Sequence, residues 1–411
     1  MSAAYSDKSG GGLRQRSLAD GLGFAGDAAP FVAARDSVSG MEYLYRGRDL
    51  AEKGIRLELG AYQRHVLLDF RDMREDADHP WGALCDQLGG RGVSSLSDAM
   101  RDLQLKPVHD RLCALLDRTL AQQIADSKVA KPKVRVSTAK TTPKTAAKEP
   151  APSNQIIEDA TARVRSFLDC VHQVASPQSE SAFGVTAADK WRGTQDDALQ
   201  QFRGTLSSAF KLPQVEALLS EPCPNDACAV LPGSGTPPAS SAAIWETVLA
   251  WAALRAAGAW IDPYDCETAA TKVFDNLRLR QPMAQAFEAA GWEGEECWRA
   301  AARVRALLAH AAWAPGSRVS SMHPPFTWLH DPDVGWLIGV HQHQGTRYFV
   351  KEPFERLLWW MALPALVRLA ESPDASKVRS LESEIRARLE SAAAARYRLE
   401  ALFEIEKKVE V

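Results

Sequence analysis

The chain has 411 residues, of which 45% are hydrophobic and 25% charged, and its formal net charge is −3. This composition is typical of a globular protein with a sizeable core, and the length allows two or three domains. A net charge this close to neutral argues against nucleic acid or a membrane surface as the partner of the whole molecule.

Three further features predict a cytoplasmic location. No apolar run approaches the roughly 20 residues that a membrane-spanning helix needs. The Ser- and Gly-rich start lacks the apolar segment of a secretory signal. Seven cysteines, an odd number in a long chain, favour reduced thiols over a disulfide framework.

We expect residues 1–16 to be a disordered lead-in and residues 17–126 to form a β-rich module with covering helices. Apolar and polar residues alternate with the period of a half-buried strand, and Ser39-Gly40 suits a tight hairpin. The predicted strands are Phe31–Arg35, Met41–Arg46, Ile55–Leu59 and His65–Phe70. The predicted helices of this module are 81–88, 94–103 and 107–124.

Residues 127–154 contain six Lys and four Pro but no aromatic residue. Such a segment cannot bury enough surface to offset the entropy lost on ordering, so we expect a linker between two domains. The alternative is a basic arm that binds a polyanion.

Residues 155–371 read as a helical domain, and 372–411 as an amphipathic C-terminal helix over 375–408. Together with the β-rich module, this predicts an α+β protein whose larger part is helical. The loop at 221–241 is rich in Gly, Ser and Pro. The helices expected in this domain are 156–175, 187–210, 242–260, 264–290, 295–313 and 352–370.

The sequence shows no catalytic constellation, and we expect no catalytic residue, cofactor or metal. Gly89-Gly90-Arg91-Gly92 lacks the spacing and the Lys of a phosphate-binding loop, and no Gly-x-Ser-x-Gly elbow occurs. Cys223 and Cys228 have no second ligand pair at zinc-finger spacing. Four histidines cluster without a carboxylate to orient them: His323, His330, His341 and His343.

The aromatic-rich stretch 326–361 is the best candidate for binding a ligand. Flat aromatic faces beside Gln and His side chains can hold a sugar ring or a peptide. The alternative is that these aromatic residues fill the helical core. The candidate residues are Trp336, His341, Gln342, His343, Gln344, Tyr348, Trp359 and Trp360.

Several segments resemble the region behind the catalytic barrel of very long bacterial α-amylase-like glycoside hydrolases. In the first part of the chain they are Met41–Leu50, Gly54–Arg71, Leu88–Arg101 and Leu105–His109. In the second part they are Leu337–Gly345 and Phe349–Trp360. These segments are typical of packing and turns, so no active-site residue of the family can be carried over to this chain. The family's catalytic barrel is missing.

The resemblance implies a non-catalytic accessory protein or C-terminal region of an α-glucan-processing enzyme, which docks on or stabilises an amylase-like catalytic barrel. It also suggests α-glucan as a possible ligand. Two alternatives remain open. One is an enzyme with a site around His341 and His343, and the other is a free-standing scaffold protein with a coiled-coil tail.

Overall fold

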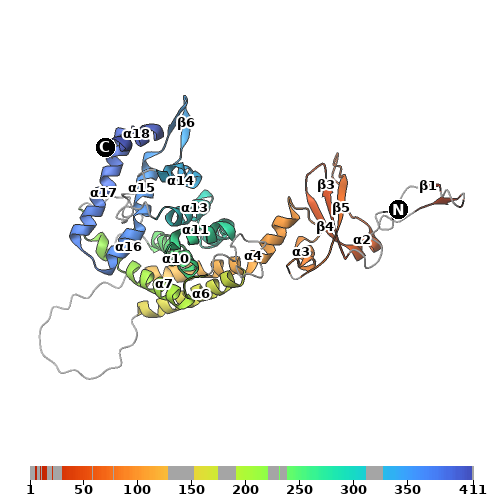
Figure 1. The fold of residues 1–411 in the computed structure, drawn as a ribbon, viewed down its shortest axis with the longest axis horizontal. Coiled ribbons are helices and arrows are strands. Elements are labelled where there is room, and N and C mark those ends of the chain that lie inside the picture. The colour runs from red at the N-terminus through yellow and green to blue at the C-terminus, as the bar shows by residue number, and fades with distance from the viewer. Residues whose placement is uncertain are drawn as a thin grey trace, which may run out of the picture. The chain divides into compact units, whose positions relative to one another are not determined.

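The chain divides into two compact units, Met1–Lys106 and Pro107–Val411, which we call the β-rich unit and the helical unit. Together they give the α+β class predicted from sequence (Figure 1). The computed structural model describes residues 5–6, 10, 12–15, 21, 30–57, 59–76, 78–127, 152–174, 191–220, 231, 238–311 and 327–409.

An antiparallel sheet of order β4-β3-β5 forms the centre of the β-rich unit. The strands are β3 (Phe31–Asp36), β4 (Glu42–Arg46) and β5 (Leu67–Met73). The predicted hairpin is confirmed, because Arg35 pairs with Glu42 across the turn and Gly40 adopts a φ of 73°. In the expected lead-in, the structure describes a short pairing of β1 (Tyr5–Ser6) with β2 (Leu13–Arg14).

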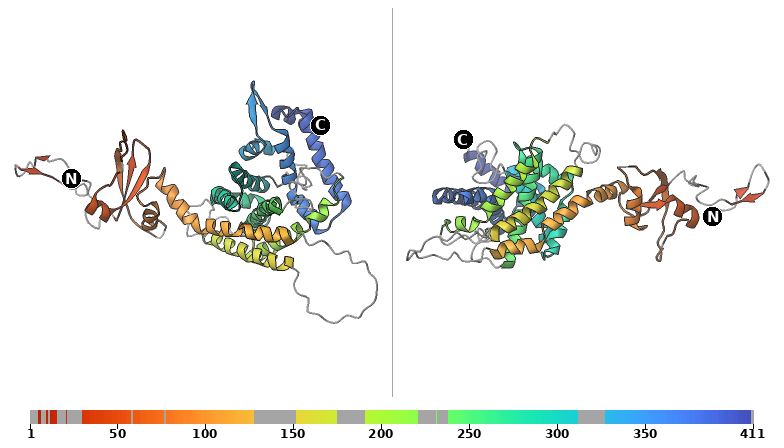
Figure 2. Two further views of the ribbon diagram at one scale, coloured as in Figure 1. Left: turned by 180° about the vertical axis from the view of Figure 1, so that it is seen from behind. Right: turned by 90° about the horizontal axis from the view of Figure 1, so that it is seen from below.

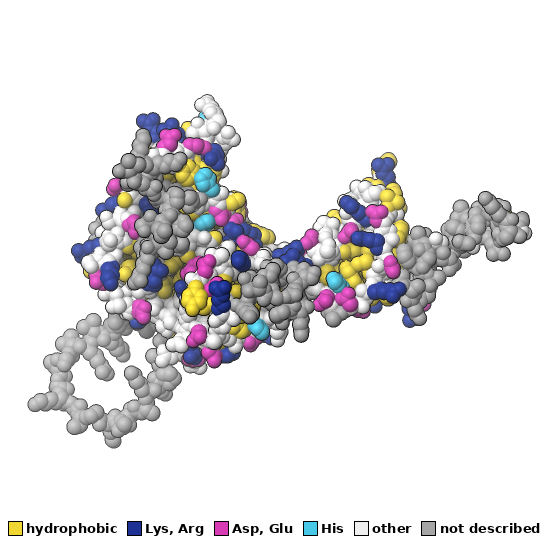
Figure 3. Space-filling view, in the orientation of Figure 1, with side chains coloured by type: hydrophobic (Ala, Val, Ile, Leu, Met, Phe, Trp, Pro, Cys, Tyr) yellow, Lys and Arg dark blue, Asp and Glu magenta, His cyan; other side chains and the backbone are white. Residues whose placement is uncertain are grey.

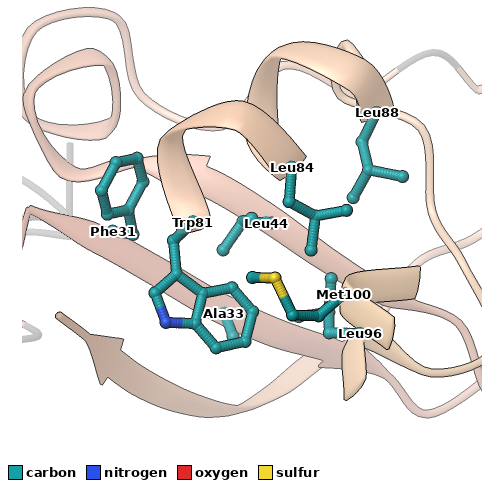
Figure 4. Close-up of a cluster of buried hydrophobic side chains, with 8 residues drawn as sticks. All are labelled: Phe31, Ala33, Leu44, Trp81, Leu84, Leu88, Leu96 and Met100. Carbon is teal, nitrogen blue, oxygen red and sulfur yellow. The ribbon is translucent and has the colours of Figure 1, made fainter. Parts of the chain in front are cut away.

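Helices cover one face of this sheet. Helix α3 (Trp81–Leu88) begins after Pro80 and ends at Gly89, which takes the left-handed conformation that suits glycine (φ 56°). Figure 4 shows the side chains of α3 and of the first turns of α4 (Leu96–Leu115) against those of β3 and β4. Each fully buried large side chain contributes roughly 1.5–3 kcal/mol to stability. The cluster consists of Phe31, Ala33, Leu44, Trp81, Leu84, Leu88, Leu96 and Met100.

One strand prediction is wrong, and another, His65–Phe70, is present but displaced to Leu67–Met73. Residues 55–59 form no strand where they are described; this stretch follows α2 (Gly47–Lys53) as a loop. In β5, a bulge at Asp69 (φ 52°) breaks the alternation. Leu68 is therefore half exposed, whereas Phe70 packs on Val32 of the opposite sheet face.

The helical unit is built around α10 (Pro238–Ile261), which is buried along most of its length. It packs against α5 (Arg118–Ser127), α7 (Gln195–Ala209), α11 (Cys266–Asn276) and α13 (Glu295–Ala309). Small residues allow this close approach: a Cβ on Gly258 would lie 2.0 Å from the carbonyl oxygen of Cys266.

The remaining elements complete this unit around the same core. They are α6 (Pro152–Val174), α8 (Leu212–Glu216), α12 (Arg280–Ala289), the 3₁₀ turn η3 (Thr327–His330), α14 (Pro332–Leu337), β6 (His341–His343), β7 (Thr346–Tyr348), α15 (Lys351–Met361), α16 (Leu363–Glu371), α17 (Ala375–Ala394) and α18 (Leu399–Val409). Most predicted helices are present; residues 187–190 and most of the loop at 221–241 lie outside the described residues.

Four predicted helix boundaries differ from the structure. The segment 264–290 is interrupted at Arg278 (φ 52°), and 352–370 is interrupted before Pro364, which has no N–H to donate. The single helix expected over 375–408 is broken at Arg396 and Tyr397, both with positive φ. Conversely, α4 runs straight through Pro107, where we expected a break.

The segment 127–154 does not separate two domains. The boundary between the compact units falls earlier, within α4, and the helices on either side of the segment, α5 and α6, belong to one unit. Arg163 of α6 donates a hydrogen bond of 2.9 Å to the Ala114 carbonyl at the end of α4. Both views in Figure 2 show α6 beside α5, and α7 beside α6. Residues 128–151 lie outside the described residues.

Cleavage at a specific protease site inserted between residues 128 and 151 should therefore leave the two pieces bound to each other. Because α5 packs on both α6 and α10, the pieces should elute as one particle in native buffer and separate in urea. Size-exclusion chromatography of the cleaved protein checks this. The variant Ile124→Asp, which puts a charge at a fully buried position of α5, should release the pieces. If the two pieces separate without denaturant when Ile124 is unchanged, the assignment of α5 and α6 to one unit is wrong.

Candidate functional site

The predicted ligand-binding residues divide between an exposed hairpin and a buried core. Strands β6 and β7 pair antiparallel, with His343 opposite Thr346. The positive φ angles of Gln344 (47°) and Gly345 (80°) are those of a two-residue hairpin turn. His341, Gln342, His343 and Gln344 are all exposed. The hairpin projects from the helical unit as a polar finger (Figure 1).

The two hairpin histidines lie on the same face of β6, as predicted for alternate residues of a strand. His341 Nδ1 lies 3.0 Å from the Gly339 carbonyl, and its ring stacks on Tyr348. Among the described residues, no group of three potential metal ligands is assembled here or elsewhere. Cys223, Cys228 and His323 lie outside the described residues.

Trp359 and Trp360 of α15 are buried, with 3% and 4% of their surface exposed. They therefore present no open face to a ligand and act as core residues, the alternative considered above. Trp336 of α14 is half buried and donates a 3.0 Å hydrogen bond to Glu295. The Arg299 guanidinium lies 5.1 Å from the centre of the Trp336 ring.

A second arginine of α13 makes the same kind of contact with α15. The guanidinium of Arg303, one turn after Arg299, lies 4.9 Å from the centre of the Trp360 ring. Two tryptophans singled out by the sequence are thus each paired with a cation from the same helix face. Sequence reasoning missed both arginines, because nothing in the spacing of 299 and 303 indicates which side chains they meet.

The densest polar network of the described helical unit joins α11, α13 and α14. Arg305 reaches Asp275, Asp331 and Asp333 at 2.8–3.2 Å, and His310 lies 3.0 Å from Asp331. Burial alone would raise the pKa of Asp331, but hydrogen bonds from His310 and the Asp333 N–H, with the nearby charges of His310 and Arg305, hold it well below its usual range.

Asp331 also caps α14, since its side chain accepts the Asp333 N–H at 2.8 Å. The contacts of this network join α11, α13 and α14 to one another, so we assign it a structural role. Its signal in the sequence is Asp331-Pro332-Asp333, because an acidic N-cap followed by Pro is a helix start.

A groove of about 500 Å³ lies between α6 and α7. Its charged side chains pair with one another: Arg203 with Glu158, and Arg165 with Asp196 at 3.4 Å. The groove thus has no excess charge of one sign to select a charged ligand.

In the β-rich unit, the buried carboxylate of Asp36 organises one corner of the sheet. Its Oδ1 accepts the backbone N–H groups of Val38 (3.1 Å) and Val66 (3.0 Å). Its Oδ2 accepts the Ser39 hydroxyl at 2.6 Å and lies 2.7 Å from His65 Nδ1. The hydrogen bonds from Ser39 and then Val66 hold the pKa of Asp36 well below its usual range.

Around this carboxylate, four apolar side chains face solvent. We call them the apolar corner: Val38 (49% exposed), Met41 (39%), Val66 (43%) and Leu68 (50%). The adjoining loop adds the exposed side chains of Leu57, Leu59 and Tyr62. The helical unit exposes far fewer large apolar side chains among its described residues. Figure 3 shows hydrophobic side chains interspersed with Lys and Arg on the visible face of the β-rich unit.

No protein-family model, curated protein or solved structure matches the chain. In the described part of the chain, no helix is both long enough and apolar enough to cross a membrane.

One buried carboxyl group of the helical unit belongs to no candidate site. Glu246 of α10 is 1% exposed and accepts a hydrogen bond from the indole N–H of Trp292. Burial raises its pKa to about 7, although that hydrogen bond and the charge of Arg118 oppose the shift. In the unfolded chain the same group has its ordinary pKa of 4.5.

The folded protein therefore holds a proton on Glu246 that the unfolded chain releases between about pH 4.5 and 7. The free energy of unfolding should fall as pH rises through this window, by at most about 3 kcal/mol. The isosteric variant Glu246→Gln should lose this dependence, whereas the exposed Glu293→Gln should keep it. Urea denaturation across the pH series measures both, and an unchanged slope in Glu246→Gln would contradict the assignment.

Proposed function

We propose that the chain is a non-catalytic accessory or C-terminal region of an α-amylase-like enzyme of α-glucan metabolism, and that its β-rich unit docks on the catalytic barrel. The apolar corner is the observation that carries this proposal. Large apolar side chains that are exposed close together on a protein surface mark a candidate interaction site. Here the exposed side chains belong to a turn, a loop and an edge strand.

The geometry of the corner suits docking because its exposed side chains stand on a fixed backbone. Val38 and Val66 donate their N–H groups to the same carboxylate oxygen, so their positions are set before any partner arrives. A surface that is already ordered binds at a lower entropic cost than one that must order on binding.

The choice of partner rests on the resemblance to α-amylase-like proteins. The segments Met41–Leu50 and Gly54–Arg71, which carry it most fully, span β4, α2, the loop and β5, and so include most of the exposed apolar side chains. In the family they resemble, the corresponding region lies beside the catalytic barrel.

Two further elements belong to this proposal. The exposed hairpin is the surface on which we expect any contact with α-glucan, since Gln342, His343 and Gln344 present donors and acceptors to solvent. We also propose a cytoplasmic location, in line with the free thiols of Cys85, Cys113, Cys170, Cys266 and Cys297.

The test is binding of the full chain to an α-amylase-like barrel of the same source that lacks a β-rich C-terminal region of its own. The double variant Val38→Lys/Val66→Lys should keep its fold, because both side chains are exposed, and should bind at least about tenfold more weakly. Tyr264→Lys, at an exposed position of the helical unit, is the matched control and should bind normally. Calorimetric titration gives the affinities.

Two results would contradict the proposal. The unmodified chain could fail to bind any such barrel, or the double variant could bind as well as the control.

A further inference from the structure

Arg303 occupies an unusual position for a charged side chain. Only 11% of the side chain is exposed, and the guanidinium lies over the Trp360 ring. Guanidinium groups stack readily on aromatic faces, and a stacked guanidinium keeps its in-plane N–H donors available.

Those donors have no acceptor among the described residues. The nearest carboxylate oxygen, on the exposed Glu296, lies 4.0 Å away, which is beyond hydrogen-bonding distance. Glu296 also lies 3.7 Å from Arg299, which pairs with Glu295 at 3.4 Å. Glu295 and Glu296 are thus both engaged by Arg299.

The surroundings of Arg303 add positive charge. Arg299 precedes it by one helical turn, and Arg356 of α15 is close enough to repel it. Burial, with this repulsion from Arg356 and Arg299, lowers the pKa of Arg303 to about 10 despite the attraction of Glu296. A cation that is largely withdrawn from water and repelled by neighbouring cations is costly, so a site of this kind gains stability from an anion.

We propose that Arg303, flanked by Arg299 and Arg356, binds a small oxyanion, which is either a phosphate group or a carboxylate. Both groups match the planar fork of a guanidinium with two parallel hydrogen bonds. The Trp360 ring packs on the guanidinium of Arg303, and Arg299 and Arg356 add positive charge nearby. This site lies in the helical unit and does not depend on the proposed docking function.

The experiment is thermal unfolding of the full chain in increasing inorganic phosphate or sodium acetate, each matched with sodium chloride at the same ionic strength. A ligand that binds the folded state raises the melting temperature along a saturating curve. We expect such a curve for at least one anion. A response to phosphate alone identifies a phosphate ligand, and a response to acetate alone identifies a carboxylate.

Variants then locate the site. Arg303→Gln should abolish the anion effect, and Arg303→Lys, which keeps the charge but loses the fork, should weaken binding at least about tenfold. Arg379→Gln removes an exposed arginine of α17 and should bind like the unmodified chain. If Arg303→Gln does not fold, the anion affinity of Arg303→Lys tests the proposal.

Three results would overturn the proposal. They are the absence of a saturating response to both anions in the unmodified chain, an unchanged affinity in the Arg303 variants, and an equal loss in Arg379→Gln.

Discussion

The carboxylate of Asp36, buried at the end of β3, accepts hydrogen bonds from the β3–β4 turn and from the residue that precedes β5. A buried carboxylate needs hydrogen-bond donors, and here two segments that are about 27 positions apart supply them and are held together by it. The constraint brings Val38 and Val66 to the same corner and leaves their side chains in solvent. The apolar corner, which we assign to partner binding, is therefore positioned by the Asp36 carboxylate, a buried group that would not itself contact the partner.

The helical unit depends on a different constraint, the burial of α10. A helix that is buried along most of its length needs neighbours on all sides, and α5, α7, α11 and α13 supply them. This requirement draws α5 into the same unit as α6 and α7, although the Lys- and Pro-rich segment 127–154 has the composition of a linker between domains. Composition identifies a segment that cannot form a core, but it carries no information on which elements the segment joins.

Local patterns predicted the α+β class, the β3–β4 hairpin and most helices, because caps, turns and periodicity are encoded locally. The errors arise where tertiary contacts decide. Residues 55–59 alternate like a strand but form none where they are described, and Leu105, Val108 and Leu112 carry the buried stripe of α4 across Pro107. The break after α17 is fixed by the Phe349 N–H, which donates to the Tyr397 carbonyl. Arg303 could not be recognised from the sequence, because the ring that it contacts, Trp360, lies 57 positions later in the chain.

The most direct test of the docking account is hydrogen–deuterium exchange of the full chain, with and without an α-amylase-like barrel. Binding through the apolar corner should slow exchange in residues 36–41 and 59–68, because the partner would cover these segments. Exchange in α10 and α13 should not change. Protection confined to the helical unit, or no protection in the presence of a saturating barrel, would contradict the account.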